Sequence, residues 1–102
     1  VPFITSAVTR LLRTSDAEVW ALADLDPAGL GWAASVPRLS ALPMPDLEAL
    51  RACPCTVAAT RFSEGIRAHS TMLGNHHQPF VKQAFGAALQ LGRGRKVADF
   101  PA

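Results

Sequence analysis

Glu18-Val-Trp-Ala-Leu-Ala-Asp24-Leu-Asp26-Pro27-Ala-Gly29-Leu-Gly-Trp-Ala-Ala-Ser-Val36 is the stretch of sequence that decides the fold. Its uncharged apolar run, residues 19–23, is short and typical of a buried strand. Residues 30–36 are mostly small and predict a helix, with Pro27 in its first turn, where a missing N–H costs nothing. A strand followed at once by a helix indicates an α/β unit.

Two aspartates, Asp24 and Asp26, follow the predicted strand. Residues at i and i+2 of an extended segment point to the same face, so both carboxylates can offer oxygens to one cation such as Mg²⁺. Asp26 is equally a natural N-cap of the helix that follows, and Asp24 an ordinary turn residue. The residues alone leave both interpretations open.

The string Ala-Asp24-Leu-Asp26-Pro27-Ala-Gly29-Leu after an apolar strand resembles the second acidic motif of Toprim domains. It is most similar to the form found in the topoisomerase VI A-subunit and in the nuclease subunit of Wadjet plasmid-defence systems. The resemblance covers residues 19–36. It implies a Mg²⁺-dependent module that binds or cleaves DNA, with Asp24 and Asp26 as its catalytic residues and metal ligands.

Toprim domains also carry a glutamate at the end of an earlier strand, and this sequence has no acidic residue before Asp16. Strand breakage by the topoisomerases further needs a tyrosine from another domain, and this chain has no tyrosine. The resemblance therefore implies a module that is incomplete alone: a fragment, one domain of a larger protein, or an inactive remnant used for binding. Whether the chain is itself an enzyme stays open.

The composition predicts one folded domain. Of 102 residues, 49% are hydrophobic and 18% are charged, which is enough for a core and too little charge for disorder. The formal charge of +2 permits contact with nucleic acid without requiring it. No apolar run approaches the length that spans a bilayer, and two cysteines make no disulfide framework. We therefore expect a cytoplasmic protein with free thiols and no membrane contact.

The fold class that we predict is helix-rich α/β, a small single domain over residues 1–92 with helices packed on a short parallel sheet. Helical periodicity or capping predicts helices over residues 5–13, 47–52 and 80–91, and another that starts at Ser63 and ends at Gly74. Three prolines exclude a regular helix from the connector, residues 36–45. Residues 56–60 are compatible with either a strand or a helix.

A basic, flexible tail is predicted over residues 93–102. Its cations, Arg93, Arg95 and Lys96, could contact the phosphates of a nucleic-acid backbone. Cations after the end of a helix are also favoured by its dipole, so a solvated charged surface is the competing interpretation.

Several other residues have ordinary structural interpretations. Paired cysteines of structural zinc sites usually stand two to four residues apart, whereas Cys-Pro-Cys has a gap of one. We therefore expect ordinary thiols and a surface loop rather than a zinc site. We expect the glycines to allow close packing of helix and sheet. We expect the tryptophans to lie in the core or at an interface. These residues are Cys53, Cys55, His69, His76, His77, Gly29, Gly31, Trp20 and Trp32.

A second class of function fits the composition. The low charge and the many alanines and leucines are typical of a small, non-enzymatic interaction protein or a subunit of a larger complex. Such a chain would bind a protein partner or form a homo-oligomer, with residues 36–45 along an apolar surface.

Overall fold

The computed structural model describes residues 6–55 and 57–101. Along these residues the elements are α1 (Ser6–Thr14), β1 (Val19–Trp20), α2 (Pro27–Ala34), β2 (Leu39–Ala41), α3 (Leu47–Ala52), α4 (Ala59–Gly74), α5 (Pro79–Leu91) and the 3-10 helix η1 (Val97–Asp99). The predicted fold class, a small helix-rich α/β domain, is confirmed. Thr5, Thr56 and Ala102, which belong to predicted segments, lie outside the described residues.

β1 and β2 form a two-stranded parallel sheet, in which Val19 lies opposite Leu39 and Trp20 opposite Ala41. Parallel strands need a crossover connection, and α2 supplies it, so β1, α2 and β2 make one βαβ unit. β2 falls within residues 36–45. As predicted, this proline-containing segment holds no helix. It is more than a connector, however, because it supplies a strand of the sheet.

The prediction of a buried strand over residues 19–23 is wrong in length, and it is right in burial for only one face of the segment. Only β1 itself is paired as a strand, although Ala21 N still donates to Ala41 O at 3.1 Å. Ala21 and Ala23 are buried, whereas Trp20 is 62% and Leu22 63% exposed. Alternate side chains of a strand point to opposite faces, so one face of this segment meets the core and the other meets solvent.

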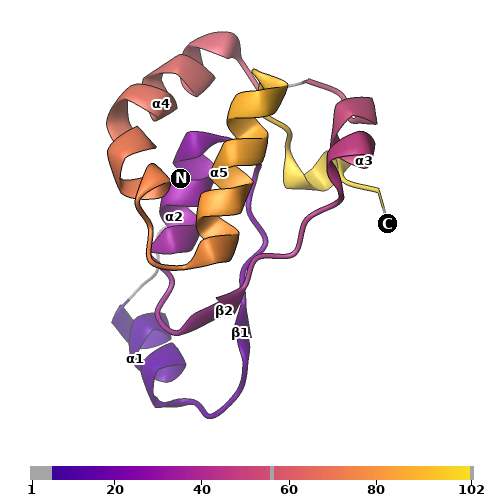
Figure 1. Cartoon of the computed structure of the whole chain (residues 1–102). Coiled ribbons are helices and arrows are strands. Elements are labelled where there is room, and N and C mark those ends of the chain that lie inside the picture. The colour runs from indigo at the N-terminus through magenta and orange to yellow at the C-terminus, as the bar shows by residue number, and fades with distance from the viewer. Residues whose placement is uncertain (1–5, 56, 102) are drawn as a thin grey trace.

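The core lies among three helices, with α2 between α4 and α5 (Figure 1). Five side chains there are fully buried: Leu30 and Ala33 of α2, Leu73 of α4, and Val81 and Ala88 of α5. A helix that packs on two neighbours is apolar around most of its surface, which explains why α2 carries no charged residue.

The predicted ends of α5 and α3 are confirmed, whereas the start of α4 is not. Gly92 ends α5 with a φ of 76°, a conformation that glycine adopts readily. α4 begins at Ala59, ahead of the predicted Ser63. Its N-cap, Ala58, makes no side-chain capping bond, so the sequence holds no start signal there.

α1 lies at the opposite end of the molecule from α3 (Figure 1). None of its residues is buried. Its last turn is tied to the domain by Arg38, whose Nη1 donates to Leu12 O and to Ser15 O. α1 is therefore attached by polar contacts and not by a shared core.

The C-terminal segment is attached to the domain and is not a flexible tail over its described length. Leu25 and Arg95 form an antiparallel bridge, with Leu25 N donating to Arg95 O at 2.7 Å and Arg95 N to Leu25 O at 3.0 Å. Phe100 is partly buried and packs against the core. This segment brings η1 next to the acidic turn before α2.

Candidate functional site

Asp26 is the N-cap of α2. Its backbone is extended, with φ −147° and ψ 163°, and its Oδ1 accepts from Gly29 N at 2.6 Å. Pro27 occupies the first helical position, where it leaves no N–H unpaired. The side chain of Asp26 is nevertheless 0% exposed, which is unusual for a capping aspartate.

Asp24 lies at the rim of the same turn. Its Oδ1 accepts from Val97 N at 2.8 Å, so this carboxylate holds the start of η1 in place. The side chain of Asp24 keeps 28% exposure. Each aspartate therefore uses its Oδ1 for a backbone hydrogen bond and leaves its Oδ2 for another partner.

That partner is the same for both, the guanidinium of Arg61 in α4. Arg61 Nε lies 3.3 Å from Asp26 Oδ2, and Arg61 Nη2 lies 4.0 Å from Asp24 Oδ2. Asp26 Oδ2 is buried and makes no hydrogen bond of proper geometry to the described residues, although it lies within ion-pair distance of Arg61. Arg61 itself is 54% exposed, so a cation at the surface covers the two carboxylates.

Close backbone packing brings these groups together. A Cβ on Gly65 would lie 3.1 Å from Pro27 Cβ and 3.2 Å from Ala28 N, so glycine lets α4 cross tightly over the start of α2. Gly65 stands four residues after Arg61, on the same face of α4. The close crossing therefore also places Arg61 over the acidic turn.

Beside the aspartates lies a cavity of about 680 Å³, lined in part by Asp24, Gly29, Trp32 and Arg61. Trp32 Nε1 is buried without a hydrogen-bond partner among the described residues. The acidic turn thus forms one wall of a recess that is otherwise largely apolar.

The three predicted phosphate-binding cations differ in placement. Arg95 is only 4% exposed, and its guanidinium donates to Leu50 O at 2.9 Å and to Arg93 O at 2.7 Å. The expectation that it contacts a nucleic-acid backbone does not fit this position, because the side chain is buried and carbonyls accept from its Nε and Nη1. Arg93 is exposed and donates to Val57 O at 2.9 Å, and Lys96 is exposed one residue before Val97.

The cysteines and histidines are spread over the fold. Cys53 is buried and Cys55 exposed, and both are free thiols. Within residues 6–55 and 57–101, no three histidine, cysteine or acidic side chains form a group that could hold a metal ion. The ring of His69 packs against Gly31, where a Cβ would lie 2.9 Å from Nδ1.

Arg61 is the site residue that sequence reasoning missed. Its pairing with Asp24 and Asp26 depends on how α4 crosses α2, and no local pattern around residue 61 indicates it. The glycine at position 65 is connected with that crossing, but a glycine inside a helix has many causes.

In the part of the chain that is described, no helix has the length and apolar character needed to cross a membrane. Comparison of the chain with protein-family models, with curated proteins and with solved structures finds no match. The resemblance to Toprim domains therefore stays a prediction from the sequence of residues 19–36.

Proposed function

We propose that this chain is a Toprim-like nucleic-acid-binding module in which Asp24 and Asp26 hold Mg²⁺. The observation that carries the proposal is the convergence of two carboxylate oxygens, Asp24 Oδ2 and Asp26 Oδ2, on one cationic group. A place where two fixed carboxylates meet one positive charge is chemically suited to a metal ion as well as to a guanidinium.

The donor set fits Mg²⁺. This ion takes oxygen ligands in an octahedron, usually one or two carboxylates together with waters and phosphate. Asp26 Oδ2 has no hydrogen bond to lose among the described residues, and Arg61 is exposed enough to turn toward solvent when a metal ion replaces it. Bound there, the ion would neutralise the charge of a phosphodiester next to the exposed Lys96.

Two acids do not make a complete cleavage centre of the Toprim kind. A third acidic ligand is not near them within the described residues. We therefore propose metal-dependent binding for this chain, and cleavage of nucleic acid only where a further acid comes from another part of a larger protein or assembly.

The test is a titration with MgCl₂ or MnCl₂, followed by thermal denaturation. At ten times the Kd, binding to the folded state adds about 1.4 kcal/mol, which raises the Tm of a domain of this size by about 5 °C or more. Asp24→Asn removes this rise, and Arg61→Ala strengthens it because the competing guanidinium is gone. Asp46→Asn, a capping aspartate outside the site, leaves it intact.

The metal proposal fails if neither the wild-type protein nor Arg61→Ala responds to either ion, or if Asp46→Asn loses the response as well. For nucleic acid, binding of a labelled oligonucleotide is measured by fluorescence polarisation in Mg²⁺ and in EDTA. We expect tighter binding in Mg²⁺ for the wild type and no such difference for Asp24→Asn. The difference is the readout, since removing a negative charge alone favours binding of a polyanion.

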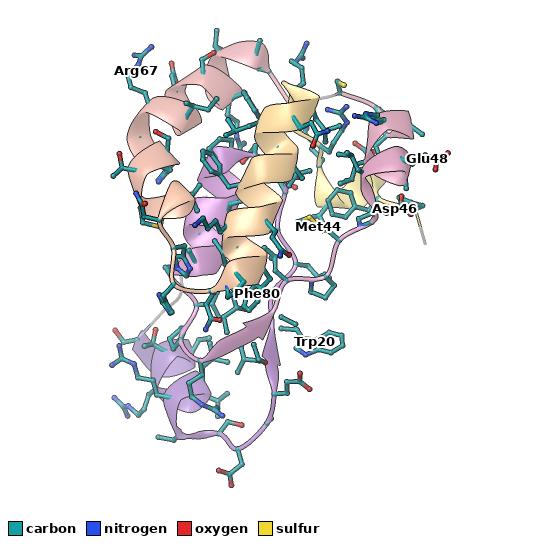
Figure 2. All side chains as sticks on the ribbon, in the orientation of Figure 1. Trp20, Met44, Asp46, Glu48, Arg67 and Phe80 are labelled. Atoms are coloured by element: carbon teal, nitrogen blue, oxygen red, sulfur yellow. The ribbon has the colours of Figure 1, made fainter. Side chains whose placement is uncertain are left out.

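The second candidate, a non-enzymatic interaction protein, is favoured by one specific observation. Trp20 and Leu22 are more than 60% exposed on the same side of one segment. Figure 2 shows Trp20 beside β1, directed away from the helices. Sedimentation analysis tests self-association, and a strict monomer that captures no partner through this face would count against it.

A further inference from the structure

We infer that the pocket between α1, the turn before β2 and the loop from α4 to α5 binds a phosphate-class dianion. It has a volume of about 460 Å³, and Arg13, Arg38, His76 and His77 all line it. No carboxylate is among the described residues that line it. This inference involves none of the residues of the acidic turn and holds or fails separately from the metal site.

Arg38 is held in position at a cost. Its φ is 58°, in the left-handed region, where a residue other than glycine is disfavoured by roughly 1 kcal/mol or more. Its Nη1 donates to Leu12 O and to Ser15 O, which fixes the guanidinium. Arginine has five N–H donors, and no oxygen of the described residues accepts from its Nε or Nη2. Fixed, unused donors at a pocket wall are suited to a tetrahedral anion.

The positive charge of the pocket is not neutralised from within. Among the described residues, Arg61 is the arginine that pairs with carboxylates, so neither Arg13 nor Arg38 has such a partner. Arg13 comes from α1, whereas Arg38 comes from the turn before β2. A dianion that contacts both would add to the polar attachment of α1.

His76 and His77 also line the pocket, as a stacked pair with ring centroids 4.5 Å apart. His76 Nδ1 accepts from Gln78 N at 3.1 Å, so the remaining ring nitrogen, Nε2, carries the proton in the neutral form. Desolvation and the neighbouring His77 lower the pKa of His76. A bound dianion would act in the opposite direction and favour the protonated ring.

The first test uses sulfate, a tetrahedral dianion whose charge does not change with pH between 5 and 8. The imidazole signals of the full chain are followed by NMR during a pH titration, in sulfate and in chloride of equal ionic strength. We expect sulfate to raise the pKa of His76 and to bind more tightly as the pH falls, since Arg13 and Arg38 stay charged throughout. Identical titration curves in the two salts would overturn the inference.

Variants locate the site. Arg38→Gly relieves the backbone conformation while removing the guanidinium, and Arg13→Ala removes the second cation; each should weaken sulfate binding about tenfold. Arg67→Ala is the matched control, because Arg67 is an exposed arginine of α4 far from α1 (Figure 2). If Arg67→Ala weakens binding as much, the effect is one of net charge and the pocket is not a site.

Two further ligands identify the source of the phosphate group. Pyrophosphate represents a small free phosphate compound, and a short single-stranded oligonucleotide with a 5′-terminal phosphate represents the end of a nucleic-acid strand, because a terminal phosphate can carry two charges whereas a backbone phosphodiester carries one. Either ligand supports the inference if it shifts the His76 and His77 signals and loses affinity with Arg38→Gly. The ligand that binds more tightly at equal ionic strength indicates whether the natural ligand is a small phosphate compound or a nucleic acid. Failure of both to shift these signals would overturn it.

Discussion

Asp26 and Asp46 begin α2 and α3 with the same local hydrogen bond, yet they occupy different surroundings. Each has an extended backbone and accepts from the N–H three residues later, at 2.6 Å for Asp26 and 2.8 Å for Asp46. Asp46 is exposed at the outer edge of the molecule (Figure 2), whereas Asp26 is 0% exposed. The capping bond therefore cannot account for the burial of Asp26.

The difference shows that capping and cation binding are not alternatives for Asp26. The cap uses Oδ1, and Oδ2 faces Arg61 together with Asp24. Among the described residues, the Asp46 side chain makes only the capping hydrogen bond from Ala49 N. The two turns thus form a natural control pair, in which one aspartate caps a helix and the other caps a helix and faces a cation.

The largest expected difference lies at the third position of each helix, Gly29 in α2 and Ala49 in α3. A Cβ on Gly29 would lie 2.5 Å from the carbonyl oxygen of Asp24, a contact that requires the backbone to shift. We expect Gly29→Ala to lower the free energy of unfolding by about 3 kcal/mol, at the upper end for overpacking. Ala49→Gly should lower it by about 1 kcal/mol through helix propensity alone.

Urea denaturation measures both variants. Equal losses for Gly29→Ala and Ala49→Gly would mean that the turn before α2 is as tolerant as the turn before α3, and that the close approach of Gly29 to Asp24 is not a constraint on the fold.

The next effect concerns the cation over the buried oxygen. Arg61→Ala leaves Asp26 Oδ2 buried without a charge nearby, and we expect a loss of about 2 kcal/mol, moderated by the exposure of Arg61. In an Asp26→Asn background the same substitution should cost much less, because the buried charge is already gone. Arg67→Ala, also in α4, is the control and should stay within about 0.5 kcal/mol.

This double-mutant cycle isolates the coupling between the two side chains. Arg61→Ala could lower the free energy of unfolding by the same amount with aspartate and with asparagine at position 26. The ion pair would then contribute nothing to stability, and the two capping turns would differ only in solvent exposure.

Much of the fold could be predicted from local patterns. The periodic apolar residues of α5, Pro79 at its start and Gly92 at its end define that helix before any tertiary contact is considered. The start of α4 could not be found, because Ala58 provides no capping side chain. The exposure of Trp20 could not be predicted either, because an apolar run does not indicate that only one face of the strand packs against the core.

Only the part of the site formed by residues close together in the sequence could be predicted. Asp24 and Asp26 are visible in the sequence because a strand end, a cap and Pro27 occur together there. Arg61 is not visible, because its place over the turn follows from the crossing of α4 and α2. The burial of Arg95 likewise depends on a bridge to Leu25, far away in the sequence. A run of basic residues gives no sign that one of them donates to carbonyls inside the domain.

The smallest expected effect on stability is at Asp46, which caps α3 and faces no cation among the described residues. Asp46→Ala should cost about 1 kcal/mol, the usual value for an N-cap, and Asp46→Asn almost nothing, because asparagine caps as well as aspartate. Asp26→Asn keeps the same capping oxygen, so its effect on helix α2 should also be small, but it should weaken the response of the Tm to Mg²⁺. Thermal melts of the two asparagine variants with and without Mg²⁺ make the comparison directly. A matching Mg²⁺ response in both would mean that the two aspartates differ in burial and not in their relation to a cation, since the same change is made at each position: an NH₂ group replaces one carboxylate oxygen, and one negative charge is lost.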